Sequence, residues 1–150
     1  MKTVPQPSFR DLTPRECKRL LDNNGVGRIA YARKSVIDIE PIGYAHVGEW
    51  LFGRTSEGTK LQVLSHHPWV AFEVDEVDGP FSWRSVVIRG TFYRLYSDKS
   101  AIELATYRRA LRAIRKRSPG ALSTADPVPF RSVLFGIHID SMTGRAASET

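Results

Sequence analysis

The chain has 150 residues, of which 41% are hydrophobic and 25% charged, a balance that excludes an intrinsically disordered protein. No apolar run approaches the roughly 20 residues that cross a bilayer, and the N-terminus lacks the apolar block of a signal peptide. The one cysteine, Cys17, excludes an internal disulfide and, without ligand partners nearby, argues against a zinc site. We therefore expect one cytoplasmic domain over residues 1–150, with no membrane partner and no metal.

The net charge of +6 raises the question of nucleic-acid binding. Residues 98–118 contain seven lysines and arginines against two acidic residues, a balance of +5 that leaves only +1 for the rest of the chain. The basic residues therefore belong to one predicted helix and not to a surface built from several elements. This distribution favours no nucleic-acid partner.

The N-terminal third predicts an arm, a helix and two strands. Residues 1–9 contain two prolines and are expected to form an extended arm. A hydroxyl, a proline and a glutamate in residues 13–16 are typical of a capping box, and Gly25 is placed to end the helix. Residues 26–32 and 36–39 follow as short β-rich runs, so we expect two strands that pair with each other.

The middle of the chain predicts mainly β-structure. Residues 41–47 and 50–52 surround a Gly-Glu pair and indicate a hairpin. Residues 69–74 form the next predicted strand, and the acidic residues 75–80 form a predicted loop. Residues 83–95 carry the longest strand signal of the chain.

The C-terminal third predicts a basic helix and a last strand. Gly90, inside the longest strand, marks a bulge or a tight barrel bend. Residues 97–117 form the basic helix, for which we expect Ser97 as the N-cap. Residues 133–140 form the last strand, and residues 146–150 are expected to be a flexible tail. Six or so short strands with one early and one late helix indicate a small β-barrel with helical additions.

One stretch suggests a ligand site. Residues 55–60, Thr-Ser-Glu-Gly-Thr-Lys, follow a strand and precede a short helix. Hydroxyls, backbone N–H groups, an ammonium group and the positive end of the helix dipole would converge there on an anion such as a phosphate. Two alternatives remain open from the residues alone: an ordinary N-cap turn, and a solvated first-turn Lys60.

Four motifs together resemble the pyridoxamine 5'-phosphate oxidase-like family of FMN-binding split barrels, and within it the branch of the nitroimidazole-resistance reductases. The resemblance covers residues 12–145. In order, the motifs are Pro-Ile-Gly-Tyr at 41–44, the turn at 55–60, His-Pro-Trp-Val-Ala-Phe at 67–72, and Trp-Arg-Ser-Val at 83–86 followed by Gly90.

The resemblance implies a fold, an assembly and a site. The implied fold is a mainly β, six-stranded antiparallel split β-barrel with a helix at the N-terminus and a helix inserted before the last strand. The implied assembly is a homodimer with two FMN molecules at the subunit interface, and Met142 to Arg145 would close over the partner's flavin. Carried over by position, the cofactor-binding residues would be Pro41, Ile42, Gly43, Tyr44, Thr55, Ser56, Gly58, Thr59, Lys60, Trp83 and Ser85.

The roles within this set also come from the resemblance. Lys60 would pair with the FMN phosphate, and residues 41–44 would lie along the isoalloxazine ring. Ser85 would contact the flavin, and Trp83 would lie near the ring or the partner subunit. The flavin would carry the hydride at N5, so no catalytic acid or base is assigned.

The chain departs from the oxidases proper at their substrate site. Tyr107 matches, but Leu111 stands where a basic residue is expected, and the C-terminal substrate segment is shortened to residues 143–145. These departures count against vitamin B6 phosphate as the substrate. Some relatives use deazaflavin or heme in place of FMN.

Several histidines have a simpler interpretation. His66 and His67 are adjacent and point apart, so a surface role is favoured over a metal pair. Tyr44 and His46 share one face of a strand, where they would either approach a ligand or pack at the mouth of the barrel.

Three functions are compatible with these observations. The first is an FMN-dependent oxidoreductase that acts on an unknown small substrate, with a deazaflavin-dependent reductase as its variant. The second is a non-enzymatic flavin- or heme-binding protein. The third is nucleic-acid binding through the basic helix, which would be salt-dependent and lost when Arg112 and Arg115 become alanine.

Overall fold

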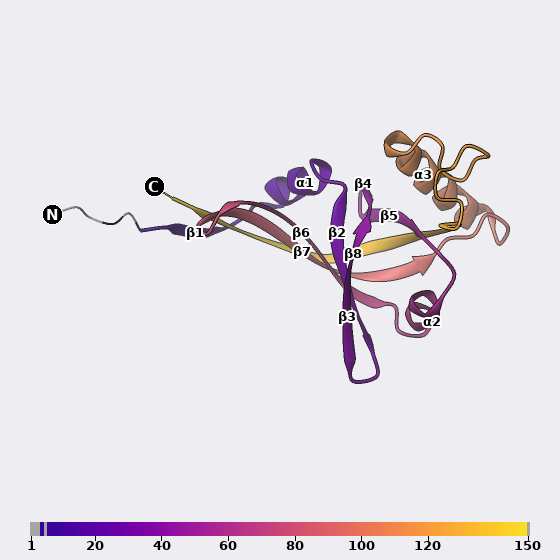
Figure 1. Ribbon diagram of the computed structural model, residues 1–150, viewed down its shortest axis with the longest axis horizontal. Helices are drawn as coiled ribbons and strands as arrows, with labels where there is room; N and C mark the ends of the chain where they lie inside the picture. The colour runs from indigo at the N-terminus through magenta and orange to yellow at the C-terminus, as the bar shows by residue number, and fades with distance from the viewer. Residues whose placement is uncertain (1–3, 5, 150) are drawn as a thin grey trace.

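The computed structural model describes Val4 and residues 6–149. Within them, eight strands form one antiparallel sheet with the order β3-β2-β6-β7-β8-β5-β4, and β1 pairs with β8. Three helices accompany the sheet (Figure 1). In chain order the elements are β1 (Ser8–Asp11), α1 (Pro14–Asp22), β2 (Val26–Arg33), β3 (Val36–Gly43), β4 (Ala45–Val47), β5 (Trp50–Thr55), α2 (Thr59–His66), β6 (Trp69–Gly79), β7 (Ser82–Arg94), α3 (Ala101–Arg117) and β8 (Val133–Ser148).

The mainly β, antiparallel fold with an early and a late helix agrees with the predicted split barrel, but the described residues form eight strands and not six. β1 was not predicted, and the predicted strand at residues 41–47 is divided: residues 41–43 continue β3, while residues 45–47 form β4 and make the predicted hairpin with β5. All four residues of β1 are exposed and show no apolar alternation, so only its pairing with the end of β8 identifies it as a strand. The short α2 is a third helix, at the place where the sequence predicted one.

The sheet curls until its two edges meet. β3 pairs only with β2, and β5 lies near the opposite edge, beside β4. The edges touch at Gly53, where an added Cβ would lie 2.8 Å from the carbonyl oxygen of Gly43. Because β3 and β5 do not form a ladder, the barrel is split along this line, and β3 keeps one row of main-chain groups outside the sheet.

Local signals predicted the start of α1 correctly, but the helix ends with Asn23 as its C-cap and not at Gly25. Glu16 N–H donates to Thr13 Oγ1 at 3.2 Å, and Glu16 Oε1 accepts from Thr13 N–H at 3.0 Å, which completes the capping box with Pro14 at the first turn. The prediction that Ser97 caps α3 was wrong. Ser100 is the cap, since its Oγ accepts from Glu103 N–H at 3.2 Å.

Two predicted irregular segments belong to strands. Residues 75–79 continue β6 and pair with β7. The acidic residues of this segment suggested a loop, but Arg84 of β7 lies 3.1 Å from Glu76 and offsets its negative charge. Residues 146–148 continue β8, with Ala146 and Ala147 buried, so the prediction of a flexible tail was wrong for them. Ser8 and Phe9 likewise join β1 and do not form a free arm. Residues 1–3, 5 and 150 lie outside the described residues.

The predicted irregularity at Gly90 is confirmed. The pairing of β7 with β8 shifts register between Arg89 and Gly90. An added Cβ at Gly90 would lie 2.4 Å from the carbonyl oxygen of His138, so no larger residue fits without a shift of β8.

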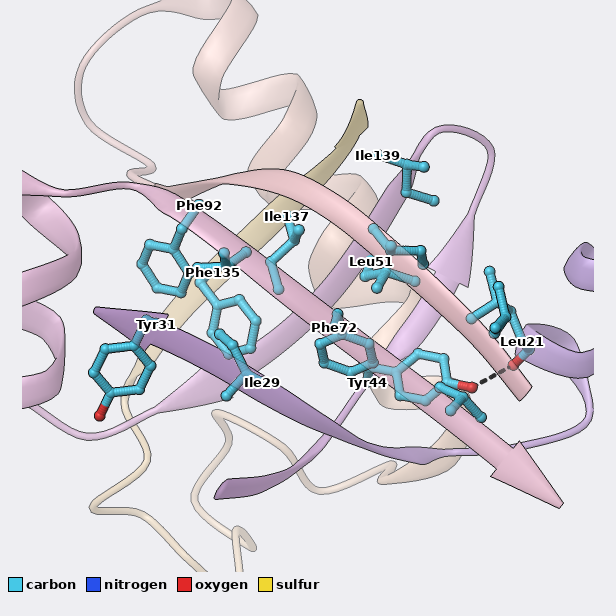
Figure 2. Close-up of a cluster of buried hydrophobic side chains, with 14 of the residues drawn as sticks. Leu21, Ile29, Tyr31, Tyr44, Leu51, Phe72, Phe92, Phe135, Ile137 and Ile139 are labelled. Atoms are coloured by element: carbon cyan, nitrogen blue, oxygen red, sulfur yellow. Dashed lines mark hydrogen bonds between the residues drawn. The ribbon is translucent and has the colours of Figure 1, made fainter. Parts of the chain in front are cut away.

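Two apolar clusters hold the fold together. The larger one fills the barrel and includes Phe72, Phe135 and Ile137, each no more than 1% exposed (Figure 2). The smaller one packs α3 against β5 and β8 through Phe52, Leu134 and small alanines of the helix. The second cluster fixes the C-terminal half of α3 and the start of the loop after it to the sheet.

The outer face of the sheet is apolar at its margins and charged at its centre. Ile37, Ile39, Trp69 and Val77 point outward and are between 66% and 77% exposed. Between them, Arg28 of β2 lies 3.7 Å from Glu73 and 3.6 Å from Asp75, both on β6. Burial, and then the neighbouring Asp75, raise the pKa of Glu73 to about 7, while Arg28 acts in the opposite direction.

This pKa predicts a pH dependence of stability. Because the pKa of Glu73 lies above its ordinary value of 4.5 in the folded chain, its protonation stabilises the fold fully below pH 4.5, and this contribution is lost as pH rises through about 7. We expect Glu73→Gln to reduce the fall in unfolding free energy between pH 5 and pH 8, measured by urea denaturation. Asp78→Asn, at an exposed position of the same strand, is the control and should keep the wild-type slope.

Candidate functional site

A cleft opens where the sheet edges part. Its volume is about 770 Å³, within the roughly 300–1,000 Å³ of ligand-binding clefts. One wall is edge strand β3, the floor is β5 with the turn after it, and the other wall is the end of α3 with the α3–β8 loop. Nine of the eleven predicted cofactor-binding residues line this cleft: Pro41, Ile42, Gly43, Tyr44, Thr55, Ser56, Gly58, Thr59 and Lys60.

The turn at residues 55–60 leaves the start of α2 without a side-chain cap. Gly58 is the N-cap residue, and no side chain accepts a hydrogen bond from the first N–H groups of the helix. The interpretation of this turn as an ordinary side-chain N-cap is therefore wrong. Because Ser56 and Thr59 line the cleft beside these N–H groups, the turn presents donors and the positive helix end to one side.

Lys60 is ion-paired and only partly exposed, which differs from a freely solvated first-turn lysine. Its Nζ makes a short ion pair with Glu40 of β3, and both side chains line the cleft. The Lys60 side chain is 23% exposed and that of Glu40 is 37% exposed. The ammonium group is therefore held at the cleft by a carboxylate that an anionic ligand would have to displace or share.

Tyr44 contributes only its main chain to the cleft. Its hydroxyl donates to the carbonyl oxygen of Leu21 at 2.7 Å, and its ring meets Phe72 edge-on at 5.3 Å between centroids (Figure 2). The side chain is directed into the core, where burial raises its pKa. Of the two alternatives for this side chain, packing is correct.

A substitution of Tyr44 tests whether this residue contributes only its main chain to the cleft. We expect Tyr44→Phe to cost about 0.5–1.5 kcal/mol of unfolding free energy, because the Leu21 carbonyl loses its shortest hydrogen bond and keeps the longer one from Asn24 N–H at 3.4 Å. Ligand affinity should not change. Urea denaturation and ligand titration measure the two effects, and Tyr93→Phe, whose ring is 48% exposed, is the control for stability. Weaker ligand binding in Tyr44→Phe would place the hydroxyl in the site.

The wall formed by the α3–β8 loop is held by an ion pair between two residues that are far apart in the sequence. Arg54 of β5 donates to Asp126 at 2.5 and 3.1 Å, and Asp126 also accepts from the N–H groups of Leu122 and Val128 at 2.9 and 3.0 Å. The Asp126 side chain is 2% exposed, and Arg54 lowers its pKa. These bonds fix the α3–β8 loop beside the cleft. Sequence reasoning missed this pair because 72 residues separate its members.

Trp83 and Ser85 do not line the cleft. Both lie on β7, near the end of the molecule that carries β1, while α2 and α3 lie at the opposite end (Figure 1). Trp83 packs against Phe9, with 6.3 Å between ring centroids, and Ser85 is paired with Asp75 and Arg145 across the sheet. Within one chain these two residues therefore remain apart from the other nine.

The remaining candidates have structural roles. His66 and His67 are exposed at the end of α2. His46 bridges Asp22 at 2.7 Å and the Gly48 carbonyl at 2.8 Å, with its side chain 7% exposed. Tyr107 packs against the smaller apolar cluster. Among residue 4 and residues 6–149, no three His, Cys, Asp or Glu side chains gather as metal ligands, and no helix is both long and apolar enough to span a bilayer.

Comparison with known proteins identifies solved structures with this fold and the family of the chain. A FAD-binding protein of Mesorhizobium loti superposes with a TM-score of 0.73 at 26% identity, over 93% of this chain and 98% of that one. The sequence profile of the family described as pyridoxamine 5'-phosphate oxidase matches residues 13–146, so the chain belongs to that family.

Two further proteins are similar to this chain in sequence or in fold. An uncharacterized protein of Rhizobium meliloti (strain 1021) is 27% identical over 146 residues, which are 92% of this chain and 95% of that protein. A candidate 5-nitroimidazole antibiotic resistance protein of Bacteroides thetaiotaomicron has a TM-score of 0.72 at 14% identity, over 96% of this chain and 90% of that one, and this likeness concerns the fold alone. The predicted family is thus confirmed.

Proposed function

We propose that this protein is an FMN-dependent oxidoreductase whose cleft binds the flavin. One observation carries the proposal: the uncapped start of α2, the hydroxyls of Ser56 and Thr59, and Lys60 all border the same cleft. A doubly charged phosphate needs backbone donors and a cation, and this is the place where the described residues supply both. The flavin phosphate therefore binds at residues 55–60.

The edge of β3 is suited to the flavin ring. Residues 41–43 line the cleft and lie on the strand whose outer main-chain groups have no ladder partner. Such groups can donate to and accept from the polar edge of a flat ring, while Pro41 and Ile42 offer apolar contact. A bound flavin supplies hydride transfer at N5, and the residues of this chain bind and orient it. The small substrate remains of unknown identity.

We propose a homodimer because a second chain would explain two observations. The outward Ile37, Ile39 and Trp69 form exposed apolar surface of the kind that protein interfaces cover. Trp83 and Ser85 do not line the cleft of their own chain, so they could contact a flavin only in a partner's cleft. The single, buried and unpaired Cys17 is compatible with the cytoplasmic location that we propose.

The experiment separates binding from catalysis. Purified protein should be yellow, show the flavin absorption bands and release flavin on denaturation. It should also oxidise a reduced nicotinamide with a quinone or a nitro compound as acceptor. Colourless protein that binds no added flavin would contradict the proposal, while bound flavin without turnover would favour the non-enzymatic binding protein. Light scattering should give the mass of a dimer.

A further inference from the structure

A row of basic side chains runs along the solvent-facing side of α3. Four of them are exposed and form what we call the basic face: Arg108, Arg109, Arg112 and Lys116. Within Val4 and residues 6–149, none of these four side chains makes an ion pair or a hydrogen bond. The sequence also contains no aspartate or glutamate between residues 105 and 118. The described part of the chain therefore leaves the positive charge of the basic face unpaired.

The needs of the helix explain only part of this charge. Cations stabilise a helix within its last turn, and there Arg115 and Arg117 also donate to main-chain carbonyl oxygens. Arg108 and Arg112 lie before that turn. Together with Lys116 they are spaced four residues apart, and like charges at this spacing destabilise a helix. The basic face thus carries a repulsion that an acidic partner would relieve.

The basic face adjoins the cleft that we propose for the flavin. Ile114 and Arg117 of the same helix line that cleft, and so does Arg131 of the α3–β8 loop. Figure 1 shows α3 and this loop together at one end of the molecule. The apolar residues that we propose for the dimer interface lie on β3 and β6, so the dimer does not require α3. A partner bound to the basic face would therefore lie beside the flavin.

Position and charge favour a small acidic electron-carrier protein as this partner. A flavin oxidoreductase needs a source of electrons, and a carrier must come close to the flavin to deliver them. Weak redox complexes form through small, charge-steered contacts, which a single helix can provide. Surfaces that bind single-stranded nucleic acid add aromatic rings on which bases stack. The aromatic residue of this part of α3, Tyr107, packs instead against the smaller apolar cluster.

We propose that the basic face of α3 is the docking surface for an acidic one-electron carrier protein that reduces the bound flavin. This inference rests on the proposed flavin function and adds its electron donor. Two reduced carriers lose one electron each, and one proton from solvent forms the N–H bond at flavin N5. These two electrons and this proton are the ones that leave as hydride to the substrate.

A binding measurement tests the docking surface apart from any turnover. The probe is an oxidised plant-type [2Fe–2S] ferredoxin, an acidic carrier, and calorimetric titration at low salt gives its dissociation constant. The double variant Arg108→Glu/Arg112→Glu should bind roughly tenfold or more weakly than the wild type, because attraction becomes repulsion. Arg15→Glu/Arg19→Glu, with the same spacing on the exposed side of α1, is the matched control and should bind like the wild type. Wild-type binding should weaken at about 0.15 M salt.

Stopped-flow reduction tests what the docking does. With FMN bound, reduced ferredoxin should bleach the flavin absorbance of the wild type and of the α1 control at the same rate. The α3 double variant should be reduced roughly tenfold or more slowly. Dithionite is a small reductant that needs no docking surface, so it should reduce all three proteins equally. Equal far-UV circular dichroism would show that the slower reduction does not come from a lost fold.

The outcomes separate this inference from the proposed function. Equal reduction of the α3 and α1 variants by ferredoxin would overturn the docking surface, while their bound FMN would keep the flavin function. Protein that binds no flavin would overturn the proposed function itself. A duplex DNA fragment or phosphatidylserine vesicles could instead bind the wild type more tightly than ferredoxin does and lose this binding in the α3 variant. That result would assign the basic face to nucleic acid or to a membrane and overturn the carrier.

Discussion

Replacing Lys60 with alanine is expected to weaken flavin binding by about 1.5–3 kcal/mol, the scale of a hydrogen bond to a charged group. That change corresponds to roughly a tenfold to hundredfold rise in the dissociation constant. The physical reason is that Lys60 is the cation beside the uncapped start of α2, where the phosphate is proposed to bind. Fluorescence titration with FMN measures the effect.

The partner of Lys60 provides the matched variant. Glu40→Gln releases the ammonium group from its ion pair and removes a negative charge from the cleft. We expect FMN to bind this variant at least as tightly as the wild type. Lys116→Ala, in the last turn of α3, is the control for a general loss of positive charge. If Lys60→Ala keeps the wild-type dissociation constant, the phosphate binds elsewhere.

Replacing Phe72 with alanine is expected to lower the unfolding free energy by about 3–5 kcal/mol, the usual cost of removing a buried aromatic ring. Phe72 is 1% exposed, and its ring meets Tyr44 edge-on. On the other side the ring contacts Gly27 so closely that an added Cβ would lie 2.3 Å from it. The loss is a large part of the roughly 5–15 kcal/mol that stabilise a domain. Urea denaturation measures it.

Loss of Phe72 should also affect the cleft. Tyr44 follows the β3 wall directly, and its ring rests on Phe72, so we expect weaker flavin binding in the folded fraction of Phe72→Ala. Phe81→Ala, at a position 46% exposed in the turn between β6 and β7, is the control and should leave both quantities near wild type. Equal losses in the two variants would mean that the ring of Phe72 has no special place in the core.

The sequence predicted the parts of the site that are contiguous in the chain. Residues 41–44 and 55–60 each form a short segment with its own local signals, and the structure places both in one cleft. The capping box at Thr13 and the irregularity at Gly90 were found for the same reason, since each depends on neighbouring residues. The resemblance to a family then indicated what the cleft would hold.

The features that the sequence did not show depend on long-range pairing. β1 is a strand only because it pairs with the end of β8, 134 residues away at Asp11 and Arg145, and the end of β8 is a strand because it pairs with both β1 and β7. The Glu40 partner of Lys60 and the Asp126 partner of Arg54 are likewise remote in the chain. No local pattern identifies such partners, because their meeting depends on how the whole sheet curls.

The sequence by itself determined the mainly β class, the family, and the turn that ends in Lys60, because periodicity and turn chemistry act between near neighbours. Only the tertiary structure decided the direction of the Tyr44 side chain, the separation of Trp83 and Ser85 from the cleft, and the loop wall that carries Phe130 and Arg131. These three features depend on how the whole sheet curls until its edges meet at Gly43 and Gly53. The free energy that favours this curled sheet comes from the packing of residues that are remote in the sequence into a common core.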